Sequence, residues 1–421
     1  MKNKNTLLDT SAFFFDGDSF RPNARFLKFL FTTTSEPSLG ITEEQRIQAL
    51  ATFLSVADEN MLADLFRAAT SSDGYCYMPA YTKGFSMLER SALERKAISI
   101  EELNRTYKRT GVYNITLNSE GKFVDMEKGE NLDDLIQAYS LMKFGSVAHI
   151  NFFARKIADK FLRELDQNAN GILESFEWIA ENNENVALFV PGSRNVHSSS
   201  NFVLERATDI INISLAQADL PTIIKVRLPR LASNTANYAQ LSAEERARRA
   251  TSTKTQLPGP DFFQNPMHII FGDDVRITGA TVDRVRESVI ANGALTFREM
   301  YAFIVDPLLA HSTPQVEHKL NTALIDGTLN QDIAYILNQP GFRPVQRLVR
   351  LVLDPSNRSG LEAFLNDGVC KAAIADLFIA TTGNDYLKNE KYRESGQILA
   401  KVAEERNVFD APLQRLKNHH Q

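Results

Sequence analysis

The sequence predicts an α/β fold, a parallel sheet flanked by helices, with mainly helical regions at both ends of the chain. Short apolar runs lie in the middle of the chain, from Val186–Val190 to Met300–Val305, and helical patterns separate them. Strands that alternate with helices through short joints are typical of a parallel sheet. Towards both ends, apolar residues instead recur at helical spacing. We expect three parts: a helical region over 1–110, an α/β domain over 111–310 and a helical region over 311–421.

Composition narrows the class of protein. The 421 residues exceed one compact core, and 43% hydrophobic with 24% charged residues is typical of a globular protein. The net charge of -5 provides no basic field, so we expect no nucleic-acid partner. No apolar run approaches membrane-spanning length, so we expect no membrane partner. Cys76 and Cys370 give neither a metal spacing nor a disulfide framework, which favours a cytoplasmic location.

The most informative segment for function begins with the apolar run Ile269–Phe271, which predicts a buried strand. Asp273 and Asp274 follow, and then the turn 278–281 leads into a helical pattern. Backbone N–H groups at such a turn and helix start can bind a phosphate. The two carboxylates can accept hydrogen bonds from neighbouring hydroxyls. The combination therefore indicates a phosphorylated sugar rather than a free phosphate.

This segment resembles the phosphoribosyl-pyrophosphate (PRPP) motif of type I phosphoribosyltransferases. That pattern is an apolar strand, two acidic residues, a short apolar link and then Thr-Gly-x-Thr. The matching residues are Asp273, Asp274, Thr278, Gly279 and Thr281. Gly272 and Arg276 depart from the pattern, because apolar residues are usual at both positions.

The resemblance implies that Asp273 and Asp274 are catalytic and hold the ribose hydroxyls. It implies that the 5-phosphate binds to Thr278, Gly279, Ala280 and Thr281. The implied reaction transfers ribose 5-phosphate from PRPP to a nitrogen nucleophile, a nucleobase or a related compound, and releases pyrophosphate. Magnesium is the implied cofactor, and a homodimer is compatible with the resemblance.

A second loop is expected to bind the pyrophosphate. The predicted strand Val186–Val190 runs into a small polar loop, and the predicted strand Thr222–Leu228 carries two cations on one face. In the resembled family, the loop after the first core strand binds pyrophosphate. The expected pyrophosphate-binding residues are Gly192, Ser193, Arg194, Lys225 and Arg227.

A long polar stretch near 231–266 is expected to form a lid, because structureless loops of this length are usually functional or disordered. It resembles the segment between the third strand and the PRPP motif in ComF-like phosphoribosyltransferases. The residues that keep the order of that pattern are Arg230, Thr235, Leu241, Ser242, Glu245 and Arg246.

The segment Asp166–Glu177 matches the calcium-binding loop of an EF-hand. Its candidate ligands for Ca²⁺ are Asp166, Asn168, Asn170 and Glu177. EF-hands normally pair, and the sequence has no second such loop. The alternative, a polar turn between two helices that ends at Asn170-Gly171, is therefore the favoured interpretation.

These observations predict a phosphoribosyltransferase that uses PRPP and magnesium. Two other functions stay open: a non-catalytic protein that senses PRPP or a nucleotide, and a calcium-binding protein built around 166–177. The sequence does not identify the acceptor.

Overall fold

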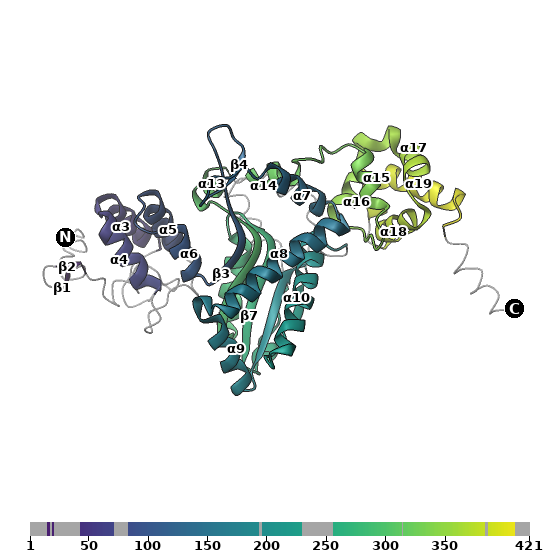
Figure 1. Ribbon diagram of the computed structural model, residues 1–421. Coiled ribbons are helices and arrows are strands. Elements are labelled where there is room, and N and C mark those ends of the chain that lie inside the picture. The colour runs from purple at the N-terminus through teal and green to yellow at the C-terminus, as the bar shows by residue number, and fades with distance from the viewer. Residues whose placement is uncertain are drawn as a thin grey trace, which may run out of the picture. The chain divides into compact units, whose positions relative to one another are not determined.

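The protein is described by a computed structural model, shown in Figure 1. The described residues are 15–16, 19–20, 43–70, 83–192, 196–229, 256–313, 315–383 and 386–408. The chain divides into two compact units. The first takes Met1–Arg109, Gly259–Pro266 and Gly279–Glu299, and the second takes Thr110–Pro258, Met267–Thr278 and Met300–Gln421. The C-terminal helices therefore belong to the same unit as most of the sheet.

A six-stranded sheet in the order β4-β3-β8-β7-β5-β6 forms the centre of the fold. Its strands are β3 (Arg109–Leu117), β4 (Phe123–Asp125), β5 (Asn185–Pro191), β6 (Ile224–Leu228), β7 (Met267–Arg276) and β8 (Thr296–Val305). β5 is parallel to both β6 and β7, whereas β3 and β4 form an antiparallel hairpin. The predicted α/β fold is confirmed, and each predicted strand corresponds to one of these elements, although β6 begins two residues later than the predicted Thr222–Leu228.

One strand is longer than the sequence indicated. The apolar run Ile269–Phe271 predicted a strand that ends before the aspartates, but β7 continues through Asp273 and Asp274 to Arg276. The register with β5 ends at Phe271, so the extension past the apolar run lies on the side of β8, the other neighbour of β7. The aspartate pair consequently lies on a rigid strand rather than in a loop.

Four helices of the second unit lie between the strands of the sheet along the chain. They are α7 (Asp133–Lys143), α8 (Val147–Asp166), α9 (Ile172–Glu181) and α10 (Ser199–Gln217). α8 and α10 pack against each other, and α10 also packs on β5 and β7 (Figure 1). The apolar side of α8, including Phe153, Ile157 and Phe161, is buried in the main hydrophobic core. This core fixes the position of α7 and α8 against the sheet.

The C-terminal helices have a hydrophobic core of their own, which extends from Ile325 to Ala403 and includes Phe144 and Val196. The helices beyond the sheet are α13 (Pro307–Ser312), α14 (Val316–Asn321), α15 (Gln331–Leu337), α16 (Gln346–Val352), α17 (Arg358–Gly368), α18 (Lys371–Thr382) and α19 (Glu390–Glu405). The predicted helical character of this end is confirmed. Phe144 and Val196 join it to the α/β part, because both come from segments that precede β7.

The first unit is mainly helical in its described part, as predicted. Its helices are α3 (Glu43–Val56), α4 (Glu59–Thr70), α5 (Lys83–Glu94), α6 (Ile100–Thr106) and α12 (Ala280–Ala291). Two short antiparallel strands, β1 (Phe15–Asp16) and β2 (Ser19–Phe20), precede them. The break between α3 and α4 is explained by Asp58, whose carboxylate accepts a hydrogen bond from the Met61 N–H at 2.8 Å.

Every helix in the described ranges is either too short or too polar to cross a lipid bilayer.

Candidate functional site

Asp273 and Asp274 lie on β7 in unequal surroundings. The Asp274 side chain is buried, and that of Asp273 is half-buried. A carboxylate oxygen of Asp273 accepts a hydrogen bond from the Asp274 backbone N–H at 2.9 Å. Packing explains why residue 272 is a glycine, because a Cβ there would come within 3.0 Å of Leu188 and Leu204. Its departure from the motif is thus explained by the close approach of β5 and α10.

Two polar side chains of α7 reach Asp274. The Lys143 ammonium lies 2.5 Å from one carboxylate oxygen, and the Tyr139 hydroxyl donates a hydrogen bond to the same oxygen at 3.2 Å. Tyr139 and Lys143 are four residues apart, so they lie on one face of the helix. Asp274 is therefore held by a buried ion pair and a second hydrogen bond.

The two carboxylates differ in pKa. Burial raises the pKa of Asp273 to about 8, and the negative charge of Asp274 adds to this increase. Burial also acts to raise the pKa of Asp274, but the Lys143 ammonium and the hydrogen bonds outweigh it, so the pKa of Asp274 is lowered. Two coupled acids pushed apart in this way are typical of functional sites. At neutral pH, Asp274 is ionised and Asp273 carries a proton.

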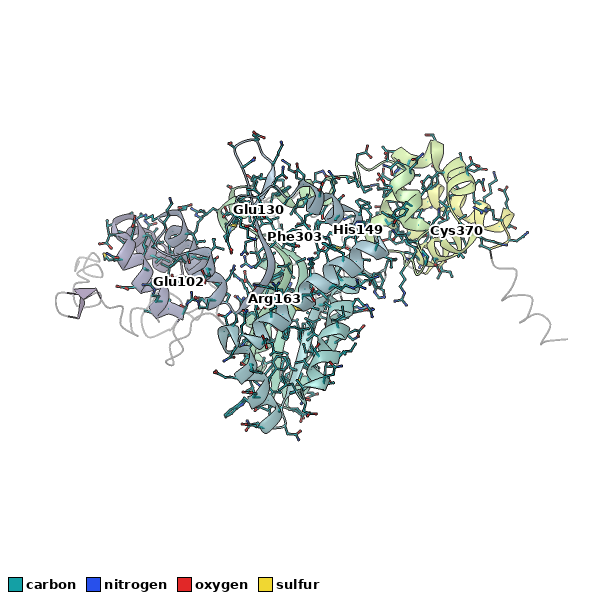
Figure 2. The ribbon with its side chains drawn as sticks, viewed as in Figure 1. Glu102, Glu130, His149, Arg163, Phe303 and Cys370 are labelled. Carbon is teal, nitrogen blue, oxygen red and sulfur yellow. The ribbon has the colours of Figure 1, made fainter. Side chains whose placement is uncertain are left out.

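Aromatic side chains support this pair. The Tyr139 ring makes edge contacts with Phe153 at 5.9 Å and with Phe303 at 5.0 Å between ring centroids. Phe303 lies on β8 and is labelled in Figure 2. The half-buried ring of Tyr113, on β3, stacks on Phe303 at 5.4 Å. This apolar layer excludes water from one side of the ion pair and strengthens its electrostatics.

The turn after β7 leads directly into a helix. Gly279 has a φ of 79°, which side-chain-bearing residues rarely adopt, and directly precedes α12. Thr278, Ala280 and Thr281 are half-buried. The first N–H groups of a helix lack partners within the helix, so this turn retains donors for an anion.

The expected pyrophosphate loop is described only in part. Ser193 and Arg194 lie outside the described residues. The Gly192 N–H donates a hydrogen bond to the Leu228 carbonyl at 2.7 Å, and a Cβ at Gly192 would lie 2.1 Å from that oxygen. The glycine is therefore needed for the contact between β5 and β6, and its N–H is already engaged. After the loop, Ser198 and Asn201 form a reciprocal cap at the start of α10.

Lys225 and Arg227 are exposed on β6 and form ion pairs with α10. The Lys225 ammonium lies 2.6 Å from Asp209, and the Arg227 guanidinium pairs with Glu205 and lies 3.2 Å from the His197 ring. Both cations thus have protein partners in this structure. A role in pyrophosphate binding stays a prediction for both.

Most of the expected lid, from 230 to 255, lies outside the described residues. Its last part, 256–266, is described and includes a short 3-10 helix, Pro260–Phe263.

Residues 167–171 form a tight turn between helices, in agreement with the favoured interpretation, although the first helix ends at Asp166 rather than at Asn170-Gly171. α8 ends at Asp166 and α9 starts at Ile172, so Glu177 lies within a helix. The Asn168 side chain accepts a hydrogen bond from the Leu173 N–H and donates one to Glu174. Across the described ranges, no three His, Cys, Asp or Glu side chains gather where they could hold a metal. Calcium binding here stays a prediction.

Sequence reasoning did not identify Tyr139 and Lys143. A signal for them was present in the sequence. Both polar groups lie on the face of α7 that packs Ile136 and Met142 into the core, where polar groups are unusual. Residue spacing cannot give their partner, since Asp274 is 131 residues from Lys143 along the chain.

Comparison with known proteins gives one family. Residues 127–399 match the sequence model of a family described as PRTase ComF-like. The match covers more than half of the chain and continues past residue 310 into the C-terminal helices. A search of curated proteins finds no match.

Proposed function

Because the chain belongs to the PRTase ComF-like family, we propose that it is a magnesium-dependent phosphoribosyltransferase whose donor is PRPP. The observation that carries this proposal is the unequal aspartate pair on β7, with Lys143 beside it, in the segment that matches the PRPP motif. The motif alone has a considerable false-positive rate. A coupled pair of acids with separated pKa values adds an independent functional signal.

In the proposed reaction, the bond between ribose C1 and the diphosphate oxygen breaks, and a bond from C1 to the acceptor nitrogen forms. Positive charge develops on the ring, as in glycosyl transfer generally. The ionised Asp274 stabilises this charge and accepts a hydrogen bond from a ribose hydroxyl. Asp273 is protonated in the free protein, and donor binding is proposed to release that proton, so that the resulting carboxylate accepts the nitrogen's proton.

Magnesium fits this arrangement as an ion held mainly by the donor. It prefers oxygen ligands and is commonly bound by substrate phosphates with one or two carboxylates. Asp273, the less buried of the pair, is the carboxylate that would contact the ion or its waters. When bound, magnesium neutralises negative charge on the leaving diphosphate.

The test is an incubation of the full chain with PRPP, magnesium and a panel of acceptors: orotate, purines, uracil and simple amines. Release of pyrophosphate that depends on one acceptor is expected. The matched control is the double variant Asp273→Asn with Asp274→Asn, which removes both acids at nearly constant size. If no acceptor gives release above this control, the enzyme assignment is wrong.

One observation favours a second candidate function, a non-catalytic sensor of PRPP or a nucleotide. Asp274 is buried, and Lys143 and Tyr139 both engage the same carboxylate oxygen, so a sugar hydroxyl can reach only the other oxygen. A sensor would bind PRPP with magnesium yet release no pyrophosphate with any acceptor. The acceptor panel and a binding titration together separate the two functions.

A further inference from the structure

The C-terminal helical region packs closely beside the candidate site. The Gln339 side-chain oxygen accepts a hydrogen bond from the Val147 N–H at 2.6 Å, at the start of α8. A Cβ on Gly145 would lie 3.1 Å from Val345. Both contacts involve the short link between α7 and α8, directly after Lys143. This packing fixes the start of α16 beside the end of α7.

Arg347, in the first turn of α16, is placed by this packing. Its guanidinium carbon lies 6.0 Å from the centre of the Phe144 ring. The guanidinium is near enough to Asp274, Tyr139 and Glu317 to interact electrostatically with all three. No residue in the described part of the chain accepts a hydrogen bond from it.

The donors of the Arg347 guanidinium are available to a ligand. Arg347 is half-buried, and burial lowers the pKa of its guanidinium. A guanidinium has five N–H donors in a fixed planar geometry, and no described residue accepts hydrogen bonds from those of Arg347. An anionic ligand at this position would supply those bonds, and a phosphate fits the planar fork best.

The same segment also contacts the chain after the expected pyrophosphate loop. The Gln346 N–H donates a hydrogen bond to the His197 carbonyl at 2.9 Å. The Arg343 guanidinium lies 5.6 Å from the centre of the Phe202 ring, and Val196 is buried in the C-terminal core. The C-terminal region therefore touches both sides of the site: the α7 side through Arg347 and the β5 loop side through Gln346.

We propose that Arg347 binds the diphosphate of the sugar donor, so that the C-terminal helices complete the donor site. This inference rests on the proposed function, because it takes the donor to be PRPP. It assigns a substrate contact to a region that the PRPP motif does not reach. Lys143, paired with Asp274, is a second cation near the same aspartate.

The test measures binding to the full chain by calorimetry, with magnesium present, for PRPP, inorganic pyrophosphate and ribose 5-phosphate. Arg347→Gln is expected to weaken PRPP and pyrophosphate about tenfold or more, since it removes charge-assisted hydrogen bonds. Ribose 5-phosphate should change less than about twofold, because it has no diphosphate. Arg347→Lys keeps the charge without the planar fork and should weaken pyrophosphate about threefold. Arg393→Gln, on the exposed face of α19, is the matched control and should resemble the parent.

Each other result overturns the inference in a recognisable way. Equal binding of all three ligands by Arg347→Gln removes Arg347 from the site and leaves the proposed function intact. Equal weakening of all three ligands means that Arg347 acts only by positioning Asp274. If the parent chain does not bind PRPP, the proposed function and this inference fail together. If Arg347→Gln does not fold, Arg347→Lys decides, and unchanged pyrophosphate affinity rejects the contact.

Discussion

Two pairs of cations in the second unit resemble each other in composition and differ in surroundings. Lys225 and Arg227 on β6 have side chains 40% exposed and pair with carboxylates of α10 that are also partly exposed. The Lys143 side chain is 12% exposed, and its partner Asp274 only 3%. Arg347 lies near the same aspartate without a described hydrogen-bond partner.

The difference shows how burial separates the cations near Asp274 from ordinary surface charge. Exposed ion pairs contribute roughly 0–1 kcal/mol, because water and salt screen them. A buried pair is costly to assemble, and loss of one partner costs roughly 3–5 kcal/mol. The β6 pair would be natural on any soluble protein. For Lys143 on α7 and Arg347 on α16, by contrast, a bound anion would give a physical reason for their burial.

The largest effect is expected when the acidic partners of the two groups of cations are replaced. Asp274→Asn should reduce pyrophosphate release about a thousandfold, because it removes charge that stabilises the transition state. Asp209→Asn, which removes the exposed partner of Lys225, should stay within about threefold of the parent. Steady-state rates at saturating PRPP make the measurement. Similar losses in both variants would mean that burial does not distinguish the two regions.

The next effect is on stability. Lys143→Met should lower the free energy of unfolding by about 3 kcal/mol at pH 7, because it leaves Asp274 buried without its cation. Lys225→Met should lower it by less than about 1 kcal/mol. Denaturant unfolding of both variants gives the two values.

The pH dependence of this deficit checks its cause. In Lys143→Met, the pKa of Asp274 should lie above its unfolded value. The penalty should therefore shrink as the pH falls and Asp274 takes up a proton. A deficit that is constant from pH 7 to pH 4 would instead indicate lost packing.

A smaller effect is the release of a proton from Asp273 when PRPP and magnesium bind. The pKa of Asp273 is about 8, so most of this acid is protonated at pH 7 in the free protein. Bound magnesium and ribose hydroxyls both favour the carboxylate and should lower this pKa, so binding should release a proton. Calorimetry at pH 7 in buffers of different ionisation enthalpy should detect the release. Release should vanish in Asp273→Asn and become small above pH 9, where the free acid is already ionised.

The smallest expected effect is at β6. Lys225→Gln and Arg227→Gln, each already paired with α10, should change the Kd for PRPP by less than about threefold. A change of tenfold or more would show that the ion pairs open on binding. In that event β6 contributes to the pyrophosphate site, as its sequence position suggested.

Much of the fold could be predicted from the sequence, because the informative signals were local. The apolar run Val186–Val190 and the helical spacing of apolar residues towards both ends of the chain each depend on neighbours along the chain. The family resemblance, drawn from Asp273, Asp274 and the turn behind them, is confirmed by the match over 127–399.

The rest depends on contacts between distant residues. The extension of β7 through the aspartates comes from strand pairing, and no local apolar pattern marks it. Lys143 ends an amphipathic helix, where a lysine is ordinary, and only tertiary packing places it on Asp274. Along the chain, several helices separate Arg347 from that aspartate, and the sequence did not relate those helices to a known family. Residue types alone could not rank it above the cations of β6.

The central claim is that the aspartate pair of β7 and the turn behind it bind a ribose 5-phosphate bearing a diphosphate. A crystal structure of the full chain with PRPP and magnesium tests it most directly. The account predicts ribose hydroxyls at Asp273 and Asp274, the 5-phosphate at 278–281 and the diphosphate within reach of Arg347. Density for the donor at any other place on the chain would contradict it.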